Sequence, residues 1–314
     1  MVERVAGPRV PLSRQTGPMP STADHPTTVT LVVNPASGGG RARRFAPRVL
    51  MALRSAGYAV KARESRDLDD VERLVGQVPA DGLVAVLGGD GTMGRAAAGA
   101  FQSGAVLAPL PGGRGNDFCR VLGVAASPVA AAATLPGAEV RRVDLAVAGT
   151  RVFVCVAHAG FDSVANEIAN STPVLRGTPV YLYAALRAVS GWVPASFTVD
   201  IGAGPQRHDG WTVAIGNGGQ YGGGMRITPH AHLDDGLLAV TLVGDISRQE
   251  FLQTLPKVFS GRHVEHPKVS TESGPQVVLS ADRPFDVYAD GERVGPLPMT
   301  FRSLPGALQV AVGR

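Results

Sequence analysis

The sequence predicts an α/β protein in which a parallel-sheet domain precedes an antiparallel β-sandwich domain. Up to residue 143, short β-branched apolar runs alternate with helical segments, which is typical of a doubly wound parallel sheet. Beyond Asp144, short apolar runs separated by Gly, Pro and Asp are typical of an antiparallel sandwich. A chain of 314 residues is long enough for two such domains.

The same change of pattern sets the expected domain boundaries. Residues 28–143 form the α/β domain, and residues 144–303 form the β-sandwich domain. The C-terminal segment 304–314 is a candidate addition to the first domain. Residues 1–27 are rich in Pro, Ser, Thr and Arg and lack the apolar stretch of a signal peptide, so we expect a disordered leader.

In the first domain, the run Leu83 to Leu87 is apolar throughout, as a strand buried on both faces requires. The expected strands cover residues 28–33, 58–63, 83–87 and 105–110, and the expected helices cover 41–56, 68–76 and 93–101.

In the second domain, residues 146–149 and 151–156 predict a hairpin. Further strands are expected at 197–201, 211–216, 237–243, 276–281, 285–289 and 308–312. Helices are expected near residues 178–192 and 247–259.

Composition excludes several classes of protein. The net charge of +4 is mild and no basic run is present, which argues against nucleic acid as a partner. The two cysteines, Cys119 and Cys155, cannot build a disulfide framework, so a reducing, cytoplasmic setting fits. No apolar run approaches the length needed to span a bilayer.

Three glycine-rich turns follow three of the expected strands, at residues 34–40, 88–92 and 111–117. In a parallel sheet these turns meet at the carboxyl edge, where ligands bind. A strand, a glycine turn and a helix together present backbone N–H groups to an anion such as a phosphate. Asp90 would repel a phosphate unless a cation lay between them, so the turn implies magnesium. Alternatively, Asp90 caps a helix.

The motifs in these turns resemble those of the diacylglycerol kinase catalytic-domain family, and more specifically its bacterial soluble lipid kinases, relatives of sphingosine and ceramide kinases. The resemblance rests on Asn34-Pro35-Ala36-Ser37-Gly38, Gly88-Gly89-Asp90-Gly91-Thr92 and Gly115-Asn116-Asp117-Phe118. It continues through Val143-Asp144-Leu145, Gly160-Phe161-Asp162, Tyr221 to Pro229, Asp234 to Leu238 and Asp290-Gly291-Glu292, in the same order along the chain.

The resemblance implies a phosphofructokinase- and NAD-kinase-like first domain, with ATP and Mg²⁺ as cofactors and a lipid alcohol as substrate. It implies that the nucleotide binds Asn34, Pro35, Ala36, Ser37, Gly38, Gly88, Gly89, Asp90, Gly91 and Thr92, together with Asn116. A peripheral contact with the inner face of the membrane is also expected, and a homodimer is a candidate assembly.

Five carboxylates are the expected catalytic groups. By resemblance, Asp90, Asp117 and Asp144 form a network that reaches the catalytic magnesium through water. Asp290 and Glu292 are both candidates for the proton acceptor, although Asp290-Gly291 alone is also a hairpin signal.

A second, structural magnesium is expected in the β-domain. By resemblance, Asp235 would bind it with the main-chain carbonyls of His232 and Leu237. Read without the resemblance, Asp234-Asp235-Gly236 is a simple turn.

The chain departs from the family's usual pattern at two places. The family commonly has Asn-Glu where this chain has Gly94 and Arg95, and Thr where this chain has Arg114. Arg114 could clamp a phosphate in place of the hydroxyl, or it could mark an altered kinase. An NAD-kinase-like small-molecule kinase and a non-catalytic nucleotide or lipid sensor therefore stand as alternatives to the lipid kinase.

Overall fold

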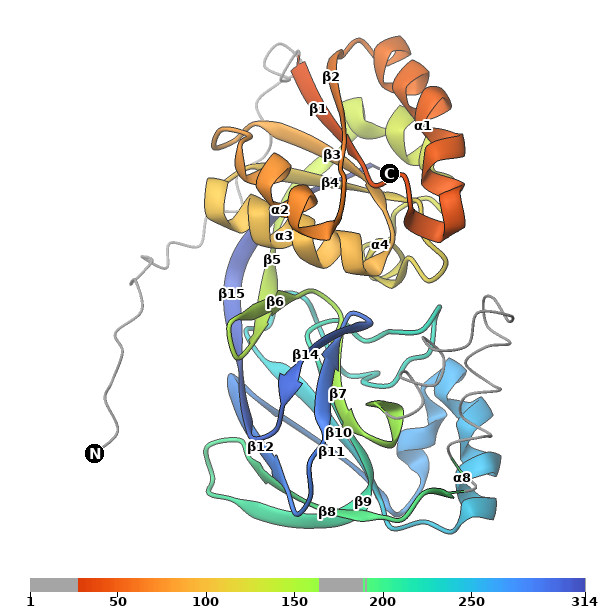
Figure 1. The fold of residues 1–314 in the computed structure, drawn as a ribbon, viewed down its shortest axis with the longest axis vertical. Coiled ribbons are helices and arrows are strands. Elements are labelled where there is room, and N and C mark those ends of the chain that lie inside the picture. The colour runs from red at the N-terminus through yellow and green to blue at the C-terminus, as the bar shows by residue number, and fades with distance from the viewer. Residues whose placement is uncertain (1–27, 164–188, 190, 314) are drawn as a thin grey trace, which may run out of the picture.

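The computed structural model describes residues 28–163, 189 and 191–313. The predicted leader lies outside the described residues, as does nearly all of the helix expected at 178–192. The described chain forms two lobes, one above the other in Figure 1.

The upper lobe in Figure 1 has a parallel sheet with strand order β2-β1-β3-β4 and helices on both faces. The strands are β1 (Thr28–Val33), β2 (Ala59–Glu64), β3 (Leu83–Gly88) and β4 (Val106–Pro111). The helices are α1 (Ser37–Ser55), α2 (Leu68–Gly76), α3 (Asp90–Ser103), α4 (Asp117–Val121) and α5 (Pro128–Ala133), followed by the 3₁₀ turn η1 (Leu135–Gly137). Each strand and helix predicted for this lobe is confirmed, with ends shifted by a few residues. The short helices α4 and α5 were not predicted.

Alternation along the strands explains the two helical layers. Leu31 and Val33 point to one face and join the core that contains residues of α1 and α5. Val32 points to the other face and joins the core that contains residues of α2 and α3. Every residue of β3 is buried, as expected for a strand covered on both faces.

The sheet does not stop at the boundary between the lobes. The long strands β5 (Glu139–Ala148) and β15 (Met299–Val312) pair antiparallel with each other and run from one lobe into the other (Figure 1). One end of β15 pairs with β12 (Gln276–Ala281), whereas Val310 near its other end pairs parallel with Leu107 of β4. A single hydrogen-bonded path therefore passes through both domains.

The second lobe is built mainly from antiparallel strands. Beside β5, β12 and β15 they are β6 (Arg151–Phe153), β7 (Val156–Gly160), β8 (Ala195–Asp200), β9 (Gln206–Gly216), β10 (Leu238–Gly244), β11 (Val269–Gly274), β13 (Asp286–Ala289) and β14 (Glu292–Pro296). Helix α8 (Arg248–Thr254) and the 3₁₀ segments η2 (Leu255–Ser260) and η3 (Arg262–Glu265) cover one side. The predicted fold class is confirmed.

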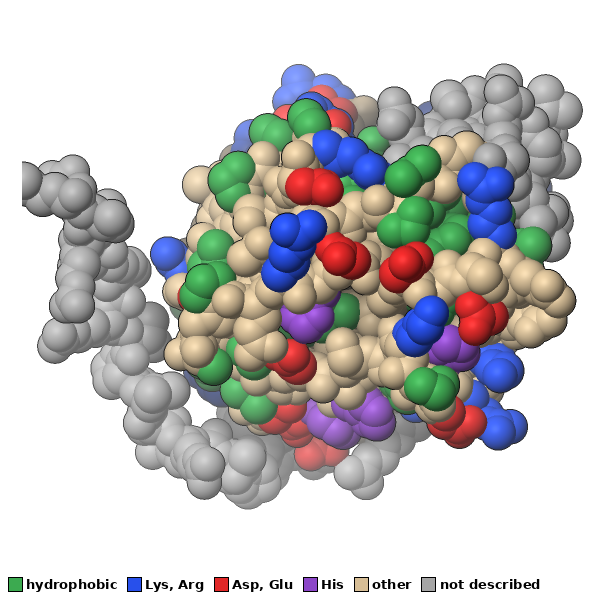
Figure 2. All heavy atoms as spheres, turned by 90° about the horizontal axis from the view of Figure 1, so that it is seen from below, with side chains coloured by type: hydrophobic (Ala, Val, Ile, Leu, Met, Phe, Trp, Pro, Cys, Tyr) green, Lys and Arg blue, Asp and Glu red, His purple; other side chains and the backbone are tan. Residues whose placement is uncertain are grey.

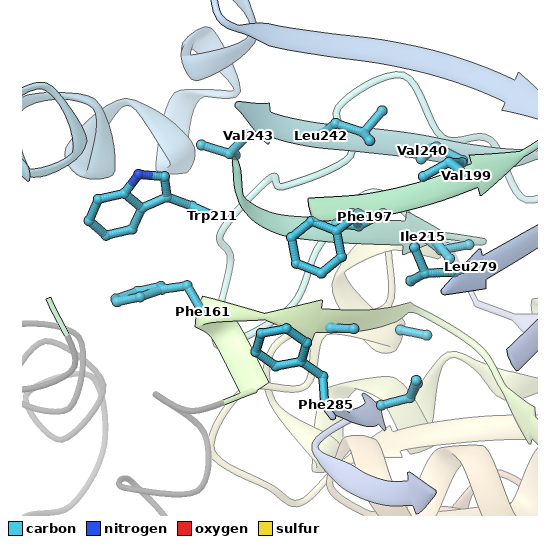
Figure 3. Packing of buried hydrophobic residues seen from close by; sticks show 14 of the residues in the cluster. Phe161, Phe197, Val199, Trp211, Ile215, Val240, Leu242, Val243, Leu279 and Phe285 are labelled. Carbon is cyan, nitrogen blue, oxygen red and sulfur yellow. The ribbon is translucent and has the colours of Figure 1, made fainter. Parts of the chain in front are cut away.

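An aromatic cluster fills this lobe. Figure 3 shows Phe161, Phe197, Trp211 and Phe285 pointing into one space between the strands. The rings of Trp211 and Phe251 stack with centroids 4.2 Å apart, which fixes α8 against the sheet. Residues of β7 and β13 belong to the same cluster, so the packing also fixes the strands next to the β13–β14 turn.

Several elements of this lobe differ from the prediction. The strand expected at 151–156 ends at Phe153, β7 and β11 were not predicted, and β15 begins at Met299 instead of residue 308. The helix expected at 247–259 ends at Thr254, and the chain continues as the 3₁₀ segment η2. Pro256 explains this change, because it cannot donate the backbone hydrogen bond that a continued α-helix needs. Strand β14 was not predicted, because its five residues include Gly295 and Pro296 and do not read as a strand.

No helix among the described residues combines the length and the apolar character needed to cross a bilayer. The far end of the second lobe, seen in Figure 2, carries basic and acidic side chains intermixed rather than a continuous basic face.

Candidate active site

The first two glycine-rich turns meet through side-chain hydrogen bonds. The buried hydroxyl of Thr92 accepts a hydrogen bond from Asn34 Nδ2 at 2.9 Å and lies 3.0 Å from Ser37 Oγ. The Ser37 hydroxyl also accepts a hydrogen bond from Gly89 N at 3.3 Å. Asn34, Ser37 and Thr92, all predicted nucleotide-site residues, are therefore brought together.

The third turn packs against the first two by direct backbone contact. Gly112 N donates to Gly88 O at 2.7 Å. A Cβ on Gly113 would lie 2.4 Å from the Cα of Gly89, and one on Gly38 would lie 2.6 Å from the carbonyl oxygen of Gly112. Side chains at these positions would push the turns apart, so the glycines are required for the close approach.

The chain enters α1 through three glycines with positive φ, at +62° for Gly38, +68° for Gly39 and +89° for Gly40. This conformation is accessible to glycine at little cost. It lets the N–H groups of Gly39 and Gly40 donate to the carbonyl of Ala36 at 3.2 and 3.4 Å, which closes the turn. Arg114 is exposed, and its Nη2 lies 3.7 Å from the position that a Cβ of Gly39 would occupy. The guanidinium therefore lies beside the predicted phosphate turn.

Asp90 begins α3, but its carboxylate caps a different helix. It accepts hydrogen bonds from the N–H groups of Asn116, Asp117 and Phe118, at 2.7, 2.5 and 3.3 Å. These N–H groups lie at the N-terminal end of α4. Asp90, in the turn at residues 88–92, therefore fixes the turn at residues 111–117. Burial, and then the charge of Asp117, raise the pKa of Asp90 to about 6.

Asp117 joins the two lobes. Its Oδ2 accepts a hydrogen bond from Gly223 N at 2.8 Å, while Oδ1 pairs with Arg120. Burial raises the pKa of this carboxyl group above its usual range. Asn116 supports the turn locally, because its side chain accepts from Gly113 N at 2.7 Å.

Asp290 is both a hairpin residue and a member of the site. Asp290 and Gly291, with φ of +49° and +85°, connect β13 to β14, which is the geometry that the Asp-Gly signal predicts. The carboxylate turns back to accept hydrogen bonds from the N–H groups of Val154, Cys155 and Val156 at 2.7, 2.9 and 3.3 Å. Burial raises the pKa of Asp290 to about 7, and the charge of Asp90 acts in the same direction.

Three carboxylates lie close to the start of α3. A Cβ on Gly115 would lie 2.6 Å from Asp90 Oδ2 and 2.9 Å from Asp117 Oδ2, so these two carboxylates are neighbours. Asp290 reaches the same helix from the second lobe, because its Oδ2 lies 3.2 Å from the position of a Cβ on Gly94. Burial raises the pKa of the Cys155 thiol, and the charges of Asp290, Asp90 and Asp117 add to this effect.

Asp144 is held by backbone groups of the second lobe, and its predicted link through water to Asp90 and Asp117 stays a prediction. Its carboxylate accepts hydrogen bonds from Gly236 N and Gly306 N, both at 2.6 Å. Asp234 and Asp235 are near enough to raise its pKa, although burial is the main cause. Asp144 thus ties β5 to β15 and to the loop that carries the predicted structural magnesium site.

The loop around Asp235 carries the oxygen atoms of the predicted structural magnesium site. Asp235 is exposed, and its Oδ1 accepts a hydrogen bond from Leu237 N at 2.9 Å. Within residues 28–163, 189 and 191–313, no three His, Cys, Asp or Glu side chains form a metal-binding group. A divalent ion at either predicted position would therefore need main-chain, water or phosphate oxygens as further ligands, and magnesium accepts such ligands.

Glu292 lies next to the second glycine turn. A Cβ on Gly91 would lie 3.1 Å from Glu292 Oε1. Its other oxygen, Oε2, pairs with Arg151 at 2.8 Å and lies 3.6 Å from Arg95 Nε. Sequence reasoning missed both arginine contacts. Arg95 stood out only as a departure from a motif, and no local pattern links residues 95, 151 and 292.

The comparisons with known proteins agree with this architecture. Residues 28–148 match the family model "Diacylglycerol kinase catalytic domain", and residues 155–312 match "YegS C-terminal NAD kinase beta sandwich-like domain". A Mycobacterium tuberculosis protein named diacylglycerol kinase is 33% identical over 291 residues, which cover 90% of this chain and 94% of that protein. A Pseudomonas fluorescens protein named "Probable lipid kinase YegS-like" is 34% identical over 271 residues, covering 82% and 87%.

A crystal structure of a putative diacylglycerol kinase from Bacillus anthracis has the same fold, with a TM-score of 0.77 at 22% identity, covering 91% of this chain and 97% of that one. The fold and the turns thus define a protein of the lipid-kinase class. The chain belongs to the diacylglycerol kinase catalytic-domain family, with a YegS-type C-terminal domain.

Proposed function

We propose that this protein is an ATP-dependent kinase that transfers the γ-phosphoryl group to the hydroxyl of a lipid alcohol, of the diacylglycerol or sphingoid type. The observation that carries the proposal is the convergence of three glycine-rich turns beside the carboxylates of Asp90, Asp117 and Asp290. Phosphoryl transfer requires mainly that the two substrates be positioned and that charge be neutralised, and this arrangement suits both tasks.

In this proposal the nucleotide phosphates bind at the turns formed by residues 34–40 and 88–92, beside the N-terminal end of α3. Asn34, Ser37 and Thr92 brace these turns, so their hydroxyl and amide groups set the shape of the phosphate site. The exposed side chain of Arg114 adds a positive charge beside Gly39 in the turn at residues 34–40.

Magnesium fits the carboxylate pair Asp90 and Asp117. Burial raises the pKa of both carboxyl groups, the charge of Asp117 adds to the effect on Asp90, and a divalent cation would offset the cost of ionising them. When bound, Mg²⁺ would neutralise phosphate charge. Asp235, with the carbonyls of His232 and Leu237, would hold the second, structural magnesium.

Proton transfer from the lipid hydroxyl is assigned to the β13–β14 turn. Asp290 has a pKa raised to about 7, which suits an acceptor that works near neutral pH. Glu292 is the alternative acceptor, because its Oε1 has no hydrogen-bond partner among the described residues.

A kinase with a lipid acceptor must meet a membrane surface, so we include peripheral contact with the inner face of the cytoplasmic membrane in the proposal. Leu252 of α8 and Phe259 of η2 are 39% and 48% exposed, and Lys257 lies between them in the chain. Exposed apolar side chains beside basic ones suit an anionic bilayer. The homodimer stays a prediction.

The test is phosphoryl transfer by the purified protein. It is incubated with radiolabelled ATP and Mg²⁺ and with dioleoylglycerol, sphingosine or ceramide in mixed micelles, and in parallel with NAD. Label in a phosphorylated lipid is the expected result, and Asp117→Ala should abolish it. Label in NADP alone, or ATP hydrolysis alone, would contradict the proposal, and the NAD result would favour a small-molecule kinase.

A further inference from the structure

Arg95 contacts acidic side chains from two other elements. Its side chain is only 18% exposed, and Nη2 and Nη1 pair with Asp69 at 2.8 Å and with Glu72 at 3.1 Å, both on α2. Its Nε lies 3.6 Å from Glu292 Oε2 on β14, within ion-pair distance, and donates no hydrogen bond to the described residues. One guanidinium on α3 therefore links a helix of the first domain to a hairpin of the second.

Glu292 also pairs with a second arginine. Arg151 Nη1, on β6, lies 2.8 Å from the same oxygen, Oε2. Both arginines thus act on one carboxylate oxygen and leave the other, Oε1, near Gly91. Oε1 is buried and accepts no hydrogen bond from the described residues. The two oxygens of Glu292 therefore have different environments: Oε2 is held, and Oε1 faces the Gly88–Thr92 turn.

The hairpin can approach α3 because two residues of the helix are glycines. A Cβ on Gly94 would lie 3.2 Å from Asp290 Oδ2, and one on Gly91 would lie 3.1 Å from Glu292 Oε1. Asp290 is fixed on its own domain by three backbone N–H groups. The ion pair between Glu292 and Arg95 connects the β13–β14 hairpin to α3 of the first domain, whereas the pair with Arg151 holds Glu292 within the second domain.

We propose that Arg95 is a positioning residue that acts through Glu292. By holding Oε2, Arg95 keeps Oε1 directed at the Gly88–Thr92 turn. It also holds the β13–β14 connection against the start of α3. Lysine could not replace it fully, because three carboxylates are contacted by three different nitrogens of one planar group. The catalytic consequence rests on the proposed lipid kinase activity, whereas the structural consequence does not.

The kinetic test compares Arg95→Met, which keeps most of the side-chain length, with Arg95→Lys. We expect Arg95→Met to lower kcat about 10- to 100-fold, since displacement of a reacting group by about 1 Å can cost that much. The KM for ATP should change less than about twofold, and Arg95→Lys should recover part of kcat. Arg73→Met is the matched control, because Arg73 pairs with Asp70 within α2.

Dependence on Glu292 separates positioning from a general loss of stability. In a Glu292→Gln background, Arg95→Met should lower kcat no further, because residues that act through one another are not additive. An equal loss in both backgrounds, or wild-type kcat in Arg95→Met, would overturn the proposal.

Hydrogen–deuterium exchange supplies a readout that needs no turnover. In Arg95→Met, amides of residues 286–296 should exchange several-fold faster than in the wild type, and in Arg73→Met they should not. If the wild type phosphorylates no lipid but this exchange difference is found, the proposed function fails and the positioning role stands. If the wild type is active and the exchange is unchanged in Arg95→Met, the positioning role fails and the proposed function stands.

Discussion

Asp117 Oδ2 accepts a hydrogen bond from Gly223 N at 2.8 Å, although the two residues belong to different domains. Gly223 lies between Gly222 and Gly224, and all three have positive φ, so the loop presents its backbone to the first domain in a conformation that other residues would strain. A carboxylate expected to serve the nucleotide is therefore already engaged by the second domain. The candidate active site belongs to the boundary between the domains rather than to either one.

Replacing Asp90 should affect both activity and stability. Asp90→Ala removes the acceptor of three backbone N–H groups, so the free energy of unfolding should fall by at least about 2 kcal/mol, as for buried donors left without a partner. Phosphoryl transfer should be lost. Urea unfolding and the lipid assay measure the two effects, and Asp282→Ala, an exposed aspartate, is the control. Wild-type stability with wild-type turnover in Asp90→Ala would refute both roles of Asp90.

Three buried carboxyl groups should lower the stability of the ligand-free protein as pH rises from about 4 to about 7.5. Asp90, Asp162 and Asp290 have pKa values raised to about 6, 6 and 7, so the folded protein keeps protons there that the unfolded chain has released, and these groups lower the free energy of unfolding as pH rises. Burial lowers the pKa of His158 to about 4 and also lowers that of His263, and these two groups act in the opposite direction, so the carboxyl contribution is measured as a difference between variants. Urea unfolding across this range measures the slope.

Asp290→Asn tests the source of this pH dependence, because the substitution removes one of the three titrations. It should reduce the slope, whereas Asp286→Asn on the same hairpin should leave it unchanged. A slope in Asp290→Asn equal to that of the wild type would show that Asp290 ionises normally in the folded protein.

Magnesium should stabilise the fold through the loop around Asp235. We expect Mg²⁺ to raise the Tm of the wild type and to have a smaller effect on Asp235→Ala, because a carboxylate oxygen is removed from the proposed site. Asp234→Ala changes an exposed neighbour and should keep the wild-type response. Equal Mg²⁺-induced shifts in the wild type and in Asp235→Ala would place the ion elsewhere.

Arg114 should strengthen ATP binding without accelerating the reaction. Its guanidinium lies beside Gly39 in the phosphate turn, where a charge-assisted contact contributes about 1.5–3 kcal/mol. Arg114→Thr should therefore raise the KM for ATP about tenfold or more, and turnover should stay equal or rise, because equal binding of ground and transition states does not raise kcat. Steady-state kinetics checks this, with Arg44→Thr on the exposed face of α1 as the control. An unchanged KM in Arg114→Thr would remove Arg114 from the nucleotide site.

The local part of the structure could be predicted from the sequence. Apolar periodicity placed the strands of the parallel sheet, and the glycine turns after them predicted that Asn34, Ser37 and Thr92 would meet. The Asp-Gly signal at 290–291 gave the hairpin turn. These predictions succeed because each depends on neighbours in the chain or on the general rule that parallel strands end at one edge.

The contacts that span the domains could not be predicted in this way. Nothing near Asp144 in the sequence indicates that its carboxylate accepts hydrogen bonds from Gly236 N and Gly306 N. The pairing of Arg95 and Arg151 with Glu292 likewise joins three distant segments, and only the packed structure brings them together.

The path of β15 has a consequence for how the protein is made. Residues 299–312 are synthesised after every other strand described here, yet they pair with β5 along most of its length and reach β4 through Val310 and Leu107. Domains of larger proteins generally fold one after another from the N-terminus during synthesis. In this protein the first domain stays incomplete at the ribosome until β15 has emerged, so the edge of β4 is open to wrong partners throughout translation of the second domain.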